Sequence, residues 1–412
     1  MTRTPGTPRL LRAINDRTAI GLLLDRGPLS KAQLAALTGL SKPTASQLLD
    51  RLEEAGYVIR VGQTAGGRGP NAQLYAVNSA ASYVAAVEVS PRQITAAVAD
   101  ITGSVLSEFA HLVNPGGGEE YDPVPDVRKA VVGAVAQAGI RVRDLSRVVM
   151  GAPGAHNPSK DSLLIADQLH SGWARPGLMT AIRRRFGIPV EIENDVNASA
   201  VAERNHGVAE DAGSFVLLWV SNGVGLAIDI GGALHRGATG GAGEIGYMPI
   251  ANVPGIGSET GTLRVADYQN LIGAPAVLRL ARLHGVTAST AKSAVTKAVA
   301  LGPDGEPFLT ELAVRLATGL ATIVAVLDPE LVVLTGDTCR AGGEAFRVLV
   351  EEELRASSPL LHPKVMVTGV EGNSVLRGAL DLALEQARDE VFGMTALTSV
   401  IPDKHPLIRR TE

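Results

Sequence analysis

Cysteine is almost absent from this chain, which holds a single one, Cys339, in 412 residues. An internal disulfide is therefore excluded, and so is a zinc site built from several cysteines. A lone cysteine without a partner motif is more often structural or incidental than nucleophilic, so no chemistry is assigned to Cys339.

Long apolar runs are missing as well. No stretch approaches the roughly 18 uncharged apolar residues of a membrane span. The first 18 residues, MTRTPGTPRLLRAINDRT, are polar and basic and lack the apolar segment of a signal peptide. We therefore expect a cytoplasmic protein without membrane association. Its length and its 45% hydrophobic content predict two to three globular domains.

Charge is unevenly distributed along the chain. Residues 1–78 carry 10 Lys and Arg against 5 Asp and Glu, whereas the rest carries 28 against 37, and the formal net charge is −4. A basic N-terminal segment on an acidic body suggests that the segment, and not the body, meets a polyanion.

The N-terminal segment has the pattern of a winged helix-turn-helix. Ser30 and Ser41 are N-cap residues, Pro43 falls in a first helical turn, and Gly39 closes the helix before it. A pair of strands around a Gly-rich tip should follow. The helices are expected at 10–27, 29–40 and 41–58, and the strands within 57–78.

The predicted second helix of this motif presents side chains that can read a major groove. Gln47 can bond an adenine edge, Thr44 and Ser46 can meet bases or phosphates, and Lys42 can meet phosphate or guanine. Arg68, at the tip of the wing, suits a narrow minor groove. These five residues are our candidate contacts to double-stranded DNA. The alternative is a helical protein-interaction module whose polar face is merely solvated.

The rest of the chain contains a weak internal repeat. VADITGSVL at 98–106 lines up with AIDIGGAL at 227–234, and each lies in a run of three short predicted strands. The repeat predicts two similar α/β lobes with a ligand cleft between them. We expect a winged helix-turn-helix at 1–78, a first lobe at 79–208 and a second lobe at 209–412, with the C-terminal helix able to pack back on the first lobe.

The chain resembles the ROK family, named for repressors, open reading frames and kinases. The family implies a duplicated, two-lobed α/β domain similar to actin and the sugar kinases, a ribonuclease H-like fold, and the attached head resembles its repressor branch. The resemblance rests on the following segments: GGRGP (66–70), GAPGAH (151–156), SGWARP (171–176), IENDVNASAVAERNHG (192–207), GVGLAIDIGGALHRGATGGAGEIGYMPI (223–250), ELVVLTGD (330–337) and EGNSVLRGALDLAL (371–384).

The resemblance includes kinases, but the phosphate site is damaged. Where a sugar kinase has a glycine turn, this chain reads Glu88-Val89-Ser90-Pro91, with no glycine and one residue that lacks an N–H. The turn at 222–225, NGVG, could still approach a phosphate. Asp195 matches the family's catalytic base. The alternative role of Asn194 and Asp195 is to cap the helix at 195–206, which Asp195 could do while also binding a ligand. We predict a regulator with no catalytic residues and no cofactor; a residual ATP-dependent sugar kinase is the less favoured alternative.

The family's zinc motif is also missing. Tyr247 stands where relatives have a histidine, and 254–263 carries no cysteine. We therefore predict no bound metal.

By resemblance, five residues are expected to bind a ligand in the cleft: Asn194, Asp195, Glu244, Tyr247 and Arg264. Tyrosine can hydrogen-bond and stack on a sugar, and an arginine could admit an acidic or phosphorylated ligand. The resemblance implies a regulator, by analogy a repressor, of carbohydrate-related genes, which acts as a homodimer or homotetramer and has a sugar-like effector. A regulator without an effector, controlled by a partner or by its abundance, is the alternative.

Overall fold

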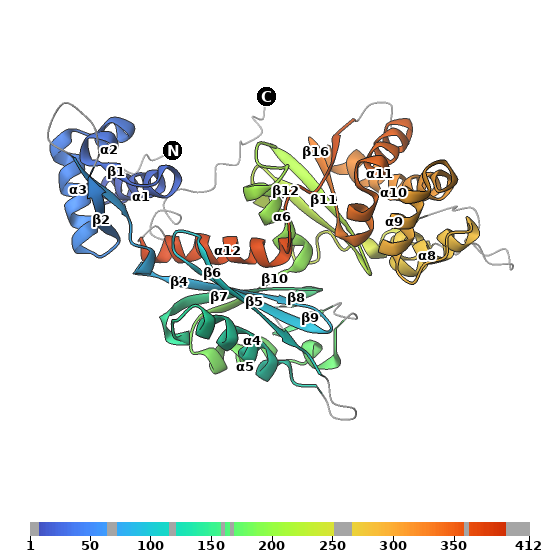
Figure 1. Cartoon of the computed structure of the whole chain (residues 1–412), viewed down its shortest axis with the longest axis horizontal. Coiled ribbons are helices and arrows are strands. Elements are labelled where there is room, and N and C mark those ends of the chain that lie inside the picture. The colour runs from blue at the N-terminus through green and yellow to red at the C-terminus, as the bar shows by residue number, and fades with distance from the viewer. Residues whose placement is uncertain are drawn as a thin grey trace, which may run out of the picture.

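The computed structural model describes residues 8–63, 72–114, 121–157, 161–164, 169–250, 266–357 and 362–392. The N-terminal head lies at one end of the molecule, the second lobe lies at the other, and the first lobe lies below them (Figure 1). The winged α/β head and the two-lobed α/β body agree with the predicted fold class.

The head is built as its capping residues predict. The Ser30 hydroxyl accepts a hydrogen bond from the Gln33 N–H, and the Gln33 side chain accepts one from the Ser30 N–H, which completes a capping box. Gly39 ends the same helix in the left-handed region at φ 71°. Ser41 caps the next helix by accepting from the Thr44 N–H. The head consists of α1 (Pro8–Arg26), β1 (Leu29–Ser30), α2 (Lys31–Thr38), α3 (Lys42–Glu54), β2 (Val58–Gln63) and β3 (Gln73–Val77), with the strands in the order β1-β3-β2.

The first lobe contains a five-stranded sheet in the order β10-β7-β4-β5-β6. β4, β5 and β6 form an antiparallel meander, and β7 and β10 add in parallel. Helices α4 and α5 cover one face through a core that includes Val127, Val131 and Ile182. The elements are β4 (Tyr83–Val89), β5 (Gln93–Asp100), β6 (Val105–Leu112), α4 (Pro123–Gln137), β7 (Leu145–Ala152), β8 (Ala155–Asn157), β9 (Ser162–Leu164), α5 (Leu178–Phe186), β10 (Val190–Asn194) and α6 (Asp195–His206).

The second lobe repeats this topology with the sheet order β13-β12-β11-β16-β17. A meander of three strands again precedes two parallel strands. The duplication predicted from the repeat at 98–106 and 227–234, which share the pattern Asp-Ile-x-Gly, is therefore present. The elements are β11 (Ser214–Val220), β12 (Val224–Ile230), β13 (Ala233–Leu234), β14 (Pro249–Ile250), β15 (Ala266–Asp267), α7 (Tyr268–Ile272), α8 (Ala274–Leu283), α9 (Ala291–Leu301), α10 (Glu306–Leu327), β16 (Leu331–Thr335), α11 (Gly336–Ser357) and β17 (Lys364–Val367). The described residues of the molecule also include five short 3-10 helices, η1 to η5.

The last helix, α12 (Ser374–Val391), returns to the first lobe. It packs on β4, β5 and β7 and crosses α6. Its apolar side chains share one core with those of the head and of the first sheet, and Figure 1 shows it running from the head to the crossing with α6. Helix α12 therefore runs from the N-terminal head to the region where the two lobes meet.

Helix α10 is the one helix among the described residues that is long and apolar enough to cross a membrane by length and composition. Half of its apolar stretch is buried, and Phe308, Leu312 and Leu316 are fully buried in the second-lobe core. We read α10 as a core helix of this lobe.

Candidate functional site

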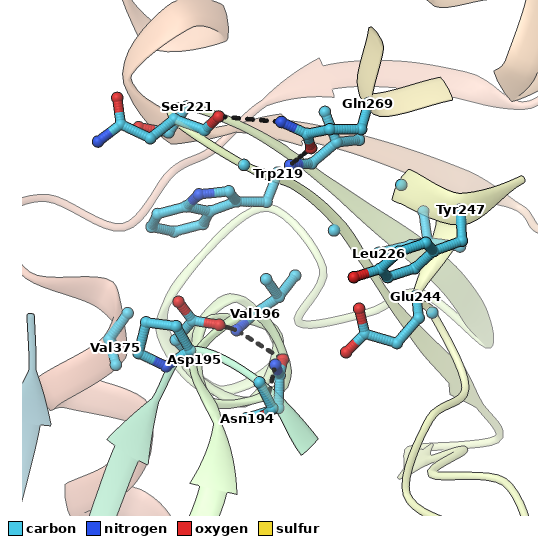
Figure 2. A pocket seen from close by; sticks show the side chains of 18 of the residues that line it. Asn194, Asp195, Val196, Trp219, Ser221, Leu226, Glu244, Tyr247, Gln269 and Val375 are labelled. Carbon is cyan, nitrogen blue, oxygen red and sulfur yellow. Dashed lines mark hydrogen bonds between the residues drawn. The ribbon is translucent and has the colours of Figure 1, made fainter. Parts of the chain in front are cut away.

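A cavity of about 520 Å³ lies between the two lobes. This volume is within the range of about 300–1,000 Å³ that small-molecule sites occupy. The first lobe contributes Glu88–Pro91 and Asn194–Val196, the second contributes Trp219 to Leu226 and Gly240 to Tyr247, and α12 contributes Val375 (Figure 2). Four of the five predicted ligand residues, Asn194, Asp195, Glu244 and Tyr247, line it. The fifth, Arg264, lies outside the described residues.

The end of β10 and the start of α6 place Asn194 and Asp195. Asn194 is the N-cap of α6: its Oδ1 accepts from the N–H groups of Val196 at 2.9 Å and Asn197 at 3.1 Å, and its Nδ2 donates to the Gly154 carbonyl. Of the two residues expected to be able to cap this helix, Asn194 is the N-cap and Asp195 is not. Asp195 is the first helical residue, and it accepts from the Val196 N–H at 2.9 Å. Because Asn194 carries the cap, the carboxylate of Asp195 faces the cavity.

Three carboxyl groups around the cavity have perturbed acidity. Burial, and then the charges of Glu244 and Glu88, raise the pKa of Asp195 to about 6. Burial raises the pKa of Glu244 as well, and it raises that of Glu88 against the opposing effect of a hydrogen bond from Asn373. Perturbed carboxyl groups that converge on one cavity are typical of ligand sites.

The loop around Glu244 is held close to β12 by glycine. Gly243 has φ 91°, and a Cβ there would lie 1.8 Å from the Leu226 carbonyl oxygen. The Leu226 N–H in turn donates to the Gly243 carbonyl at 3.0 Å. The glycines therefore bring this loop against a neighbouring strand. Figure 2 shows the result: Glu244 and Tyr247 point into the cavity from one side, opposite Asn194 and Asp195.

In each turn that could cradle a phosphate, a backbone N–H already has a partner within the protein. In the first lobe the Ser90 N–H donates to the Gln93 carbonyl at 2.9 Å, and the Ser90 hydroxyl donates to the same oxygen. In the second lobe the Val224 N–H donates to Gln269 Oε1 at 2.9 Å, while Gln269 Nε2 donates to the Asn222 carbonyl. The sequence left the turn at 222–225 as a possible half of a phosphate site, but in the structure the side chain of Gln269 bridges this turn.

Sequence reasoning missed several residues of the cavity, among them Trp219, Gln269 and Val375. Trp219 is the sixth residue of β11, Gln269 is the second residue of α7, and Val375 lies in the first turn of α12. Trp219 precedes the recognised NGVG turn and could have been noticed. Gln269 and Val375 are distant in the sequence from every motif, and only the tertiary fold brings them here.

Reactive cysteine and metal chemistry have no support in the described part of the chain. Cys339 is buried, and burial raises its pKa to about 12, which keeps it a thiol. The described residues contain no group of three or more His, Cys, Asp or Glu that could hold a metal ion. The segment 254–263, to which the zinc prediction refers, lies outside them.

The candidate DNA-reading face occupies the start of α3. Lys42, Thr44 and Gln47 are exposed there. Ser46 is half-buried and accepts from Lys31 Nζ at 2.8 Å, and Lys31 also pairs with Asp50. Arg68 lies outside the described residues. Lys42, Thr44 and Gln47 are therefore the candidates that combine exposure with the polar N-terminal end of the helix.

Residues 84–386 match the ROK family. The chain belongs to the ROK family. Residues 12–69, within the winged head, match the MarR family. The ROK match runs from β4 through most of α12 and therefore covers both lobes. It confirms the family resemblance that the sequence motifs indicated.

Two relatives of the chain are regulators by name. A putative xylose repressor of Caldicellulosiruptor sp. is 26% identical over 369 residues, which are 85% of this chain and 88% of that protein. The DNA-binding transcriptional dual regulator NagC of Escherichia coli is 25% identical over 254 residues, or 60% of this chain and 59% of that one.

Solved structures show the same fold. A ROK family transcriptional regulator, a homologue of the E. coli MLC protein, superposes with a TM-score of 0.71 at 19% identity, covering 94% of this chain and 99% of its own. The ROK hexokinase of Thermus thermophilus has a TM-score of 0.61 at 25% identity and covers 74% of this chain and 99% of its own. Its winged head and its relatives named as repressors and regulators support a regulator rather than an enzyme, although a ROK hexokinase shares its fold.

Proposed function

We propose that this ROK protein is a repressor that binds operator DNA through the start of α3 and responds to a sugar-type molecule in the inter-lobe cavity. Its relatives named for xylose and for N-acetylglucosamine repression support a sugar response. We further propose that it acts in the cytoplasm as a homodimer or homotetramer, so that two heads meet two half-sites about one helical turn, or a multiple of one, apart.

The observation that carries this proposal is the path of α12 from the cavity to the head. At the cavity end, Val375 lines the wall and Asn373, the N-cap of α12, donates a hydrogen bond to Glu88. At the other end, the ring of Phe392 meets that of Tyr57 edge-on, with centroids 5.4 Å apart. An 18-residue helix spans about 27 Å, so one rigid element reaches both sites.

The head is joined to the body by packing as well as by the chain. Ile20, Leu23 and Leu52 of the head belong to the same buried cluster as Leu380 and Leu384 of α12. The chain junction at 73–83, where β3 leads through η1 (Ser79–Ala81) into β4, is the first link between head and body. In the proposal α12 is a second link, because a shift of its N-terminal turn must be taken up by the head core.

A ligand can use these links only through differential affinity. It must bind the arrangement of lobes that disfavours DNA more tightly than the arrangement that favours it. The first-lobe and second-lobe walls of the cavity would then move relative to each other while α12 carries the change to the heads.

The test begins with DNA binding alone. An operator is selected from a random duplex pool, and affinity is measured by fluorescence anisotropy. Gln47→Ala is expected to cost about 1–3 kcal/mol on the selected sequence and much less on random DNA, because it removes a base contact. Lys42→Ala should weaken both and lower the salt dependence. Gln137→Ala, an exposed glutamine at the end of α4, is the matched control.

The same assay tests the effector. Saturating sugar in the cavity should weaken operator binding. If both α3 variants bind the selected operator like the parent protein, the DNA-reading face is refuted. If binding is specific but no cavity ligand changes it, the effector-independent regulator is the correct alternative.

A further inference from the structure

The described lining of the cavity has charge of one sign. Glu88, Asp195, Glu244 and Asp267 contribute carboxyl groups, and no Lys, Arg or His is among the described residues that line it. Arg236, which does not line the cavity, forms an ion pair of 2.7 Å with Glu193. The cavity therefore has a negative potential at neutral pH, and low-dielectric walls focus such a potential.

An indole ring forms part of the wall between these acids. Trp219 is the sixth residue of β11, and its strand register places it opposite Gly225, which has no side chain to cover it. A Cβ at Gly225 would meet Val196 at 2.8 Å, so this glycine also lets α6 approach the sheet. Figure 2 shows the Trp219 ring projecting into the cavity above Val196 and Val375, with Asp195 below it and Glu244 to one side. One apolar plate with a polar rim is the arrangement that binds the faces and hydroxyls of a sugar ring.

We propose that the cavity accepts a sugar that stacks on Trp219 and is not anionic, that it prefers a protonated amino sugar to the uncharged parent sugar, and that it rejects sugar phosphates. The proposal rests on the proposed function, because it specifies the chemical class of the effector of the same site. It replaces the expectation, drawn from Arg264, that an acidic or phosphorylated ligand could be admitted.

Electrostatics decide the ranking. Asp195, Glu88 and Glu244 already repel one another, which is part of why the pKa of Asp195 is raised. An ammonium group placed among them relieves this repulsion, and a phosphate dianion adds to it. In each turn that could have offered backbone N–H groups to a phosphate, one N–H is already bonded: that of Ser90 to the Gln93 carbonyl and that of Val224 to Gln269. A phosphorylated ligand thus meets repulsion from carboxyl groups, and no Lys, Arg or His side chain in the described wall offsets it.

The chain contains its own reporter for this proposal. It has two tryptophans, and the other one, Trp173, is only 2% exposed in the first-lobe core. Ligand stacking on Trp219 should therefore change the intrinsic fluorescence, and Trp219→Phe should abolish most of the change. The full chain is titrated with D-glucose, D-glucosamine, D-glucose 6-phosphate, D-glucosamine 6-phosphate and D-xylose, with calorimetry as an independent measure of binding.

The expected order of affinity is amino sugar, then uncharged sugar, then phosphate ester. D-glucosamine should bind about tenfold more tightly than D-glucose, and each 6-phosphate about tenfold or more weakly than its parent. Trp219→Leu should weaken binding about three- to tenfold. Glu244→Gln should narrow the gap between D-glucosamine and D-glucose 6-phosphate, whatever it does to affinity as a whole.

Each contrary outcome is decisive. A 6-phosphate that binds as tightly as its parent refutes the charge ranking, and loss of its binding in Arg264→Ala would assign the anion to that arginine. Unchanged affinity in Trp219→Leu refutes the stacking. If none of the probes binds, the ligand class is wrong. Operator binding, measured by anisotropy on the same preparations, separates these failures from a failure of the DNA-binding function or of folding.

Discussion

The two lobes have the same sheet topology, and each gives its last helix to the other. Helix α6 ends the first lobe, yet Val196 and Ala200 pack with Phe215 and Leu217 of the second sheet. Helix α12 ends the second lobe, yet Leu380 and Ala383 pack with Val84 and Ala86 of the first. The exchange differs in length: α6 has 12 residues and α12 has 18, and the extra length of α12 reaches the head.

The greater length of α12 shows how one of two equivalent helices in a duplicated fold can connect a ligand cavity to an added domain. The short helix α6 begins at the ligand cavity and ends within the body. The long helix α12 also begins at the cavity but ends in a core shared with the DNA-binding head. Helix α6 thus joins the two lobes, whereas α12 joins the lobes and also connects the ligand cavity to the DNA-binding head.

The largest effect is expected where the exchanged helices cross. A Cβ at Gly378 of α12 would lie 1.7 Å from the Ala198 carbonyl of α6. Gly378→Ala should therefore lower the free energy of unfolding by about 3 kcal/mol or more, because backbone blocks the added methyl group. Urea unfolding measures it.

Gly21→Ala is the matched control for this substitution. Gly21 also lies inside a helix, α1, but a Cβ there would have nothing within 4 Å. This variant should be neutral or more stable by up to about 1 kcal/mol. Equal losses in the two variants would show that the crossing is not a tight point of the fold.

A comparison of the repeated aspartates should give the next largest effect. Asp100 accepts from the N–H groups of Thr102 at 2.9 Å and Ser104 at 3.2 Å. Asp229 accepts from the Gly232 N–H at 3.0 Å and also pairs with Arg204 of α6. Asp229→Ala should cost about 3 kcal/mol, since it leaves a largely buried guanidinium unpaired, and Asp100→Ala only about 1–2 kcal/mol.

The measurement is thermal or urea unfolding of both variants under the same conditions. The first-lobe arginine that reaches the equivalent turn, Arg388 of α12, donates to the Ile101 carbonyl at 3.0 Å and does not depend on Asp100 for that bond. If Asp100→Ala is as costly as Asp229→Ala, the asymmetry between the two turns is refuted.

Much of the fold could be predicted because its signals are local. Ser30, Gly39 and Ser41 set the helix ends of the head, and the Asp-Ile-x-Gly turns revealed the duplication. Each of these residues acts within a few positions of itself, so its pattern is visible in one stretch of sequence.

The cavity was predicted less completely because its chemistry is assembled from distant segments. Asn194, Asp195, Glu244 and Tyr247 stood in recognisable motifs, and the structure brings them to one cavity. Gln269 closes a turn 45 residues earlier in the chain, and Asn373 holds Glu88 across 285 residues. The exchange of α6 and α12 likewise has no local signal, since an amphipathic helix does not show which sheet it covers.

A third prediction separates the two exchanged helices by function. Phe392→Ala removes the ring that meets Tyr57, and it should cost about 2 kcal/mol, less than a central core position, because the helix end can relax. Its main effect should be on coupling: ligand affinity stays the same, while the change that ligand causes in operator affinity falls about fivefold.

The control for this variant is Phe186→Ala, a similarly buried phenylalanine at the end of α5 on the far face of the first sheet. It should lose stability without losing coupling. If coupling survives in Phe392→Ala as fully as in the control, the ligand signal reaches the head through the junction at 73–83 and not through α12.

The smallest effect should appear at Asp195, and it should be a gain. Folding raises the pKa of this carboxyl from its ordinary 3.8 to about 6. Stability from the protonated form is thus fully present below the lower value and is lost as the pH rises through the higher one. Near pH 7.5 the folded protein holds an unfavourable charge, so Asp195→Asn should raise the free energy of unfolding by about 1–2 kcal/mol, less than the full shift because the group is partly exposed to the cavity.

The gain at Asp195 should shrink near pH 4.5, where the native carboxyl is already protonated. Asp144 of the same lobe provides the opposite case, because its hydrogen bonds with Arg141 lower its pKa, and that stability is present above the unfolded pKa and lost as the pH falls. Asp144→Asn should bring no gain at pH 7.5. Urea unfolding of both variants at the two pH values measures the contrast. A gain in the free energy of unfolding of Asp195→Asn that does not depend on pH would show that the buried charge of Asp195 is not what destabilises the folded protein at the ligand cavity.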